Sequence, residues 1–230
     1  MDQFKPLSPQ EVGQFYKQIT EHVIKTGGIA ELTYVAGSNQ LRAKLTHPTR
    51  KGNSVDDLGR IICKATKEVL EAATGLEVHY SQTIQQVPSV HLKPDVGSFV
   101  EFSGDYAGLL ITNLSTRAAM EIYRGQMLHM GLGEEDLATE HTSDEVVDSI
   151  GELINQVIGK ARLMIEQKYG LSAYNSQPKA IALTESVTLS IATHKDTEYQ
   201  LRRLSFKVNG APFQVELQME NVDFRIDPEV

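Results

Sequence analysis

The longest regular pattern of apolar residues in the chain lies between Asp144 and Tyr169. Apolar residues recur there at steps of three and four, which is the period of one buried face of an α-helix. Ser143 is a candidate N-cap for this helix, and Gly170 is a candidate C-terminal stop. The pattern therefore predicts a helix over residues 144–169. Its predicted buried face consists of Val147, Ile150, Ile154, Val157, Ala161 and Met164.

The polar residues of this helix gather on the side opposite the apolar face. At about 100° per residue, Asp148, Glu152 and Asn155 fall within roughly 60° of each other. Gly159 continues this line, and Arg162 borders it. Because glycine has no side chain, another surface could approach the helix closely at Gly159. Two acids and an amide are thus predicted to point away from the core together.

Three shorter apolar periods predict further helices. The first follows Ser8, Pro9 and Glu11, which form a typical helix start, and it ends at Gly27–Gly28. The second begins at Ser54 or Asp56 and runs to about Thr74, and the third is capped by Ser115 and runs to Leu128.

Alternating apolar residues and turn signals predict strands between these helices. Residues 82–94 are polar with two prolines and are predicted to be irregular. Helices among hairpin-linked strands, without strict alternation, favour an α+β fold with a mainly antiparallel sheet packed against long helices. The predicted strands are Ile29–Val35, Leu41–Leu45, Leu76–Tyr80, Ser98–Phe102, Ala107–Thr112, Lys179–Leu183, Val187–Ala192, Leu204–Val208 and Phe213–Met219.

The loop over residues 47–53 divides the chain into two predicted parts. Residues 1–53 form a helix-and-hairpin extension, which could be an arm or a dimerisation element. Residues 54–230 form the main domain, and at 230 residues the chain is long enough for one large domain with an added piece.

Composition and charge exclude several classes of function. The formal net charge is −8, the sequence pI is about 5.4, and no run is rich in Lys or Arg, which argues against nucleic-acid binding. No apolar run is long enough to span a bilayer, so membrane insertion is not expected. The N-terminus lacks the pattern of a signal peptide. Cys63 is the only cysteine and lies in a helical apolar pattern, which favours a small core residue and a reduced, cytoplasmic setting.

A metal site is not expected either. His129 and His141 flank an acidic connector over residues 130–141, but no pair of these residues has the spacing typical of metal ligands. An acidic, solvent-exposed loop is the better interpretation. The sequence therefore predicts no cofactor of the protein's own.

The polar line on the long helix resembles a known motif. Asp148, Glu152 and Asn155, followed by Pro178 after 22 intervening residues, match the signature of the CheX/CheC/FliY chemotaxis phosphatases, in which the first position is Asp or Ser. The likeness covers about residues 54–220. It is closest to CheX, because the helix before Thr74 contains Glu68 and Glu71 but no Asn, so that the second motif of CheC is missing.

The resemblance implies hydrolysis of the aspartyl phosphate on a phosphorylated CheY-like receiver domain, with magnesium held by the receiver. Asn155 would orient the attacking water, because its amide both accepts and donates hydrogen bonds. Glu152 would dock against the receiver's lysine, while Asp148, Gly159 and Arg162 would border the contact.

Two further expectations accompany this resemblance. An exposed polar helix face is most often simply a solvated surface, so the alternative is a non-catalytic module that binds a receiver or a copy of itself. A homodimer formed by pairing of sheet edges is also implied.

Overall fold

A computed structural model of the chain describes residues 29–35, 40–46, 54–189 and 199–220. The chain divides into two compact units, Met1–Lys51 and Gly52–Val230. In the first unit, β1 (Ile29–Val35) and β2 (Gln40–Thr46) pair as an antiparallel hairpin, as the sequence predicts. The helix predicted after Ser8 lies outside the described residues.

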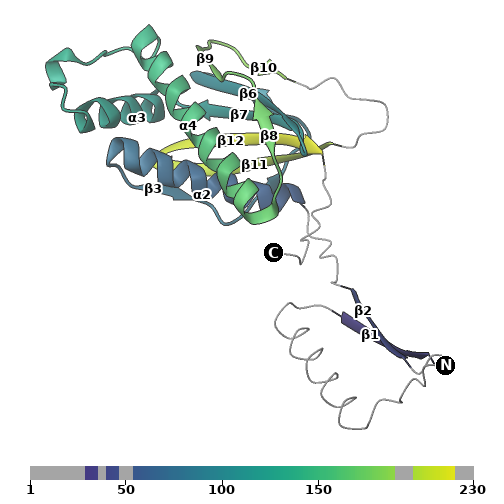
Figure 1. Cartoon of the computed structure of the whole chain (residues 1–230). Coiled ribbons are helices and arrows are strands. Elements are labelled where there is room, and N and C mark those ends of the chain that lie inside the picture. Colours follow the sequence, from purple (N-terminus) through teal and green to yellow (C-terminus); the bar gives the residue numbers. More distant parts are fainter. Residues whose placement is uncertain (1–28, 36–39, 47–53, 190–198, 221–230) are drawn as a thin grey trace. The chain divides into compact units, whose positions relative to one another are not determined.

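Three helices of the second unit cover one face of a sheet (Figure 1). They are α2 (Ser54–Thr74), α3 (Thr116–His129) and α4 (Asp144–Tyr169), and a 3-10 turn, η1 (Glu134–Asp136), lies between the last two. All three helices were predicted, and α4 has the predicted bounds. Left-handed glycines, Gly75 and Gly170, follow α2 and α4 and allow both helices to end there.

The sheet is antiparallel in every pairing, which confirms the predicted α+β class. Its main path has the order β3-β11-β12-β7-β6-β8, with β4 beside β11 and β9 beside β6, while β5 and β10 form a separate pair. The strands are β3 (Val78–Tyr80), β4 (Gln85–Gln86), β5 (His91–Leu92), β6 (Val96–Gly104), β7 (Gly108–Leu114), β8 (Ala173–Asn175), β9 (Lys179–Ala182), β10 (Val187–Thr188), β11 (Tyr199–Val208) and β12 (Ala211–Glu220).

The structure differs from the sequence-based prediction in short elements. The segment predicted as irregular contains β4 and β5, and β8 was not predicted at all. Strands of two or three residues are too short to show a period. The last hairpin turns on Asn209 and Gly210 alone, at φ 46° and 77°, and Pro212 already belongs to β12.

Two apolar layers stabilise the domain, one on each face of the sheet. The larger layer lies between the sheet and the helices and includes Leu58, Ile150 and Leu217. Cys63 belongs to this layer, as predicted, and burial raises the pKa of its thiol to about 12. The smaller layer consists of Val87, Val90, Leu92, Leu109 and Ile111. Among the described residues, no helix combines the length and apolar character needed to cross a bilayer.

The two predicted serine caps differ in the structure. The Ser115 hydroxyl accepts a hydrogen bond from the Ala118 amide at 3.2 Å, whereas the buried Ser143 hydroxyl has no partner among the described residues. Ser143 is the N-cap residue of α4, as predicted, but its hydroxyl makes no capping hydrogen bond within the described residues.

These caps give a paired stability prediction. Ser115→Ala should lower the free energy of unfolding by about 1 kcal/mol, because it removes the acceptor of an otherwise unpaired amide. Ser143→Ala should change it by less than about 0.5 kcal/mol, since no hydrogen bond is lost. Urea denaturation followed by circular dichroism measures both values, and equal losses in the two variants would contradict this assignment.

Candidate functional site

The predicted polar line lies on the outer surface of α4. Asp148, Glu152, Asn155 and Gly159 are all exposed. Within the described part of the chain, the side chains of Asp148, Glu152 and Asn155 have no hydrogen-bond or ion-pair partner. The Asn155 carboxamide is thus free to hydrogen-bond with groups outside the protein. No heavy atom lies within 4 Å of the position that a Cβ would take at Gly159, so a docking surface can approach the backbone there.

The buried side of α4 fixes the direction of this line. The structure buries a broader stripe than the sequence predicted, and the stripe is displaced at both ends. Val147 and Met164 are only half-buried, while Val146 and Ile165 take the fully buried positions. The helix contacts α2, α3 and the strands β6 and β9, and these neighbours cover more of its circumference than a single apolar face requires. The polar line nevertheless remains on the uncovered side.

Three polar contacts hold α4 along its length. Near its start, the Ser149 hydroxyl donates to Gln126 Oε1 of α3 at 2.5 Å. In its second half, Lys160 Nζ lies 3.2 Å from Glu68 Oε2 of α2. These contacts, together with the one made by Arg162, position the outward residues on a helix that is fixed to its surroundings.

Arg162 differs from the other predicted site residues because it is half-buried. Its Nη1 donates to Asn175 Oδ1 of β8 at 2.6 Å, which ties α4 to the edge of the sheet. With Tyr106 and Ile158, Arg162 lines an apolar cavity of about 30 Å³. Its side chain therefore supports the position of α4, and a contact with a partner protein stays a prediction.

Pro178 lies directly before β9, which runs beside α4. β9 pairs with β6, and a Cβ placed at Gly151 would lie 3.6 Å from the Ala180 Cβ. Proline at this position fixes φ where the chain enters the strand. The motif spacing thus joins the outer face of α4 to the strand that packs beside the same helix.

The polar line lies on the exposed, outward side of α4. Two cavities among the described residues have volumes of about 30 and 120 Å³, and neither is lined by Glu152 or Asn155. The line therefore forms a convex surface on a helix. Such a surface cannot enclose a small molecule, but it can be inserted into the concave site of another protein.

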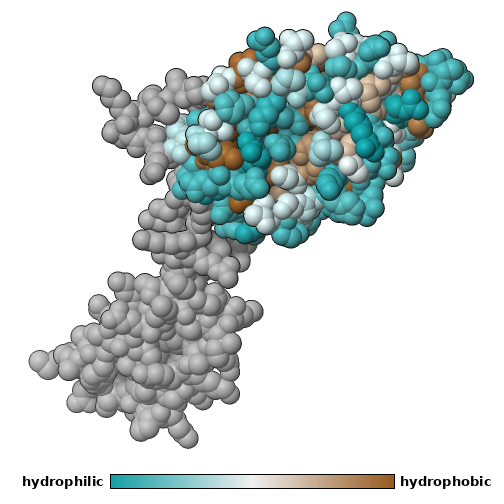
Figure 2. All heavy atoms as spheres, turned by 180° about the vertical axis from the view of Figure 1, so that it is seen from behind, coloured by the Kyte–Doolittle hydropathy of each residue, from teal (hydrophilic) through white to brown (hydrophobic). Residues whose placement is uncertain are grey.

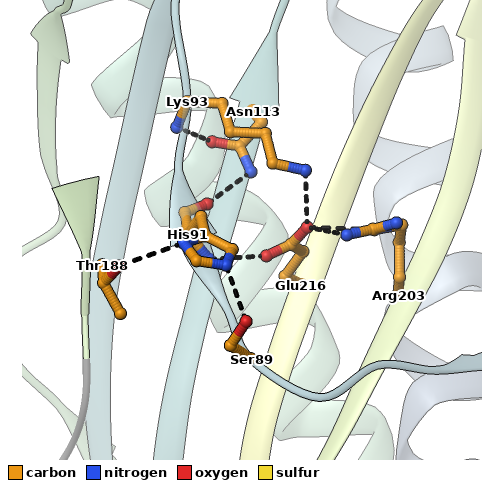
Figure 3. Close-up of polar contacts among 7 residues, drawn as sticks. All are labelled: Ser89, His91, Lys93, Asn113, Thr188, Arg203 and Glu216. Carbon is orange, nitrogen blue, oxygen red and sulfur yellow. Dashed lines mark hydrogen bonds and ion pairs between the residues drawn. The ribbon is translucent and has the colours of Figure 1, made fainter. Parts of the chain in front are cut away.

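A buried polar cluster on the other face of the sheet was not predicted (Figure 3). Glu216 of β12 is fully buried, and its Oε1 lies 3.2 Å from Lys93 Nζ and 3.0 Å from Arg203 Nε. Its Oε2 accepts the His91 amide at 2.7 Å. The carboxylate therefore holds the segment around β5 against the central strands.

Amide and hydroxyl groups complete this cluster, as Figure 3 shows. Asn113 accepts the Lys93 amide at 2.7 Å and donates to the His91 carbonyl at 2.8 Å. The His91 ring nitrogens lie 2.7 Å from the Ser89 hydroxyl and 3.2 Å from the Thr188 hydroxyl. Because these bonds join β5 and the residues beside it to β7, β11 and β12, the cluster is structural.

Comparison with protein-family models places the chain in a family. A model described as a protein of unknown function, DUF3334, matches residues 49–228, which is most of the chain. The chain belongs to the DUF3334 family. The match begins just before α2, so it includes the whole described α+β domain and excludes β1 and β2. No curated protein matches the chain.

Solved structures of CheX, CheC-like and FliY proteins are similar to this chain. The CheX protein of Desulfovibrio desulfuricans is 21% identical to this chain, with a TM-score of 0.57. The match covers 71% of this chain and 99% of the CheX chain. A CheC-like superfamily protein of Shewanella sp. PV-4 is 20% identical, with a TM-score of 0.58. The match covers 72% of this chain and 98% of the Shewanella chain. FliY of Thermotoga maritima is 18% identical, with a TM-score of 0.51. The match covers 74% of this chain and 89% of the FliY chain. The DUF3334 domain thus has a CheX/CheC-like fold.

Proposed function

We propose that this protein hydrolyses the aspartyl phosphate of a CheY-like receiver domain. The proposal rests above all on Glu152 and Asn155, which lie exposed and one turn apart on α4, without partners among the described residues. A fold similar to CheX carries these residues on the helix that the resemblance requires. Because they lie on a convex surface, the substrate would be another protein that supplies its own concave site.

Asn155 is suited to positioning water. Its carboxamide can accept one hydrogen bond from the water and donate another to a phosphoryl oxygen. Being neutral, it avoids the repulsion that a carboxylate would add beside the charged phosphoryl group. The water oxygen attacks phosphorus, and the bond from phosphorus to the aspartyl oxygen breaks. The products are inorganic phosphate and the unphosphorylated aspartate side chain of the receiver. The receiver's magnesium ion would stabilise the charge that develops.

The chain's own fold would provide the precision of this positioning. Ser149, Lys160 and Arg162 fix α4 to α3, α2 and β8 respectively. The backbone of a helix held at several points loses little further freedom when the complex forms, which favours a productive geometry. Gly159 lets the receiver approach the helix closely, and Asp148 would lie at the edge of the contact.

The proposal is tested with the full chain and a panel of phosphorylated receiver domains. The measurement is the rate of phosphate release with and without the protein. We expect release from at least one receiver to increase in proportion to the protein concentration. If a receiver binds and its own rate of phosphate loss is unchanged, the protein is a non-catalytic receiver-binding module.

Glu152→Gln gives a second prediction for the same assay. If Glu152 pairs with a receiver lysine in the complex, losing this charge should raise KM about tenfold and change kcat by less than about threefold. Raising the salt concentration should raise KM more for the unmutated protein than for the variant, because salt screens the charge pair that only the unmutated protein forms. Glu185→Gln, an exposed acid in the turn between β9 and β10, is the control and should match the unmutated protein.

A further inference from the structure

The acidic charge of the chain is concentrated in one segment. Residues 125–159 contain eight acidic residues and no Lys or Arg. Removing these eight from the 30 acidic residues leaves 22, equal to the 22 basic residues, so the segment accounts for the whole net charge of −8. All eight side chains are exposed, and only Glu134 has a described ion partner, Arg124 at 3.2 Å. The eight are Glu134, Glu135, Asp136, Glu140, Asp144, Glu145, Asp148 and Glu152.

The same segment exposes apolar side chains at the end of α3. Leu128 is 39% exposed, Met130 66% and Leu132 40%. Figure 2 shows apolar side chains surrounded by hydrophilic ones at the end of the domain where α3 lies. We name the α3-end surface as Leu128, Met130, Leu132, Glu134, Glu135 and Asp136, which lie in the last turn of α3 and the segment that follows it.

Backbone hydrogen bonds hold the apolar residues in place. The Met130 amide donates to the Gln126 carbonyl at 3.0 Å, and the Leu132 amide donates to the Met127 carbonyl at 3.1 Å. Gly131 lies between them at φ 92°, a conformation that favours glycine. Gln126 also binds Ser149, which joins this turn to the first part of α4. The surface is therefore formed before any partner binds, which lowers the entropic cost of binding.

We propose that the α3-end surface docks a cationic, amphipathic segment of a partner protein. Exposed apolar side chains favour apolar groups, and the surrounding carboxylates favour Lys and Arg. The uncompensated negative charge repels nucleic acid and anionic bilayers. Within the described residues, no group of three His, Cys, Asp or Glu side chains could hold a metal ion, so a bound cation does not explain the acids.

The expected complex is weak and sensitive to salt. Three partly exposed side chains contribute far less than the roughly 800 Å² per partner of a stable interface. Much of the specificity would come from the charge pairs at the rim, and such pairs mainly raise the association rate and are screened by salt. The inference does not depend on the proposed phosphatase activity, because no residue of the α3-end surface takes part in the proposed reaction.

A synthetic peptide tests this surface in the full chain. The probe is a fluorescein-labelled helical peptide of Lys and Leu, with Leu on one face, and fluorescence anisotropy measures its binding. One comparison peptide replaces Lys by Glu, and another replaces Leu by Ser. We expect the Lys/Leu peptide to bind at low salt and the Lys/Ser peptide to bind about tenfold more weakly. The Glu/Leu peptide should not bind.

Variants locate the binding site. Met130→Gln should weaken binding of the Lys/Leu peptide about tenfold, because it replaces the most exposed apolar side chain of the surface by a polar one and leaves the charge unchanged. Tyr174→Gln is the matched control, since Tyr174 on β8 is 77% exposed and lies outside the surface, and this variant should bind the peptide as tightly as the unmutated protein does. Equal losses in the two variants would overturn the proposal. Peptide-induced NMR shifts should lie within residues 126–148, and shifts confined to other parts of the domain would also overturn it.

A third arm separates the classes of ligand. The full chain is mixed with vesicles containing phosphatidylglycerol and with a labelled DNA duplex. We expect neither to bind at physiological salt. If either one binds and Met130→Gln weakens that binding, the surface serves a membrane or a nucleic acid, and the assignment to a cationic protein segment is overturned.

Discussion

Replacing Asn155 by Ala is expected to reduce receiver dephosphorylation roughly 30- to 1000-fold, while the protein remains folded. The range corresponds to about 2–4 kcal/mol of activation free energy, the usual cost of losing one preorganised positioning group. Asn155 is exposed and has no partner among the described residues, so its truncation removes no contact within the described fold. Receiver binding should therefore persist, and the loss should fall on kcat.

Asn155→Asp separates the shape of the side chain from its chemistry. The aspartate has almost the same size, but it replaces the donor NH₂ by a second acceptor oxygen and adds a negative charge next to the phosphoryl group. We expect this variant to be as slow as Asn155→Ala. If it retains most of the activity, water positioning by a neutral amide is the wrong explanation.

Gln156→Ala is the matched control for both variants. Gln156 is also an exposed amide on α4, but it follows Asn155 and therefore points about 100° away around the helix. Its loss should change kcat by less than about twofold. Equal effects at Asn155 and Gln156 would indicate a general perturbation of the helix surface. Full activity in Asn155→Ala would remove this residue from the mechanism.

Replacing Glu216 by Ala is expected to destabilise the domain by about 3 kcal/mol. The variant loses a fully buried carboxylate that binds Lys93, Arg203 and the His91 amide, and it leaves two cations without their counter-charge. Breaking a buried ion pair by removing one member costs about 3–5 kcal/mol, and the low end applies here because both cations reach solvent. The midpoint of thermal unfolding should fall by about 6–12 °C.

Gln214→Ala is the control for Glu216→Ala, because Gln214 lies two residues earlier on the same face of β12. Gln214 is only half-buried, so its truncation should cost less than about 1 kcal/mol. Urea denaturation of the full chain measures both variants. Similar losses would show that the carboxylate cluster contributes no more than an ordinary strand position.

The sequence predicted the helices and the direction of the candidate site because both depend on a long period. The bounds of α4, the exposure of Asn155 and the burial of Ile150 all follow from one repeating pattern over 26 residues. The period of the whole pattern sets the side of the helix on which each residue lies, and a small shift in the edge of the apolar stripe does not change that side. The polar line therefore stays exposed, although Val146 and not Val147 is the buried valine at the start of the stripe.

Other features depend on contacts that a single sequence does not show. Glu216 alternates with Val215 and Leu217, as a solvent-facing residue of a strand does, but the segment around β5 covers that face of the sheet. Ser143 has the residue type and backbone of a cap, yet its hydroxyl accepts no hydrogen bond within the described residues. Arg162 was predicted at the border of a partner contact, and its bond to Asn175 depends on β8, an element too short to predict.

The central claim is that Asn155 holds the attacking water in a complex with a receiver domain. A crystal structure of the full chain bound to a receiver whose aspartate carries beryllofluoride tests it most directly. We expect the α4 surface to be inserted at the receiver's active site, with the Asn155 carboxamide within about 3 Å of a water in line for attack and Glu152 beside a receiver lysine. A receiver docked on another surface, or an Asn155 that faces bulk solvent in the complex, would contradict the account.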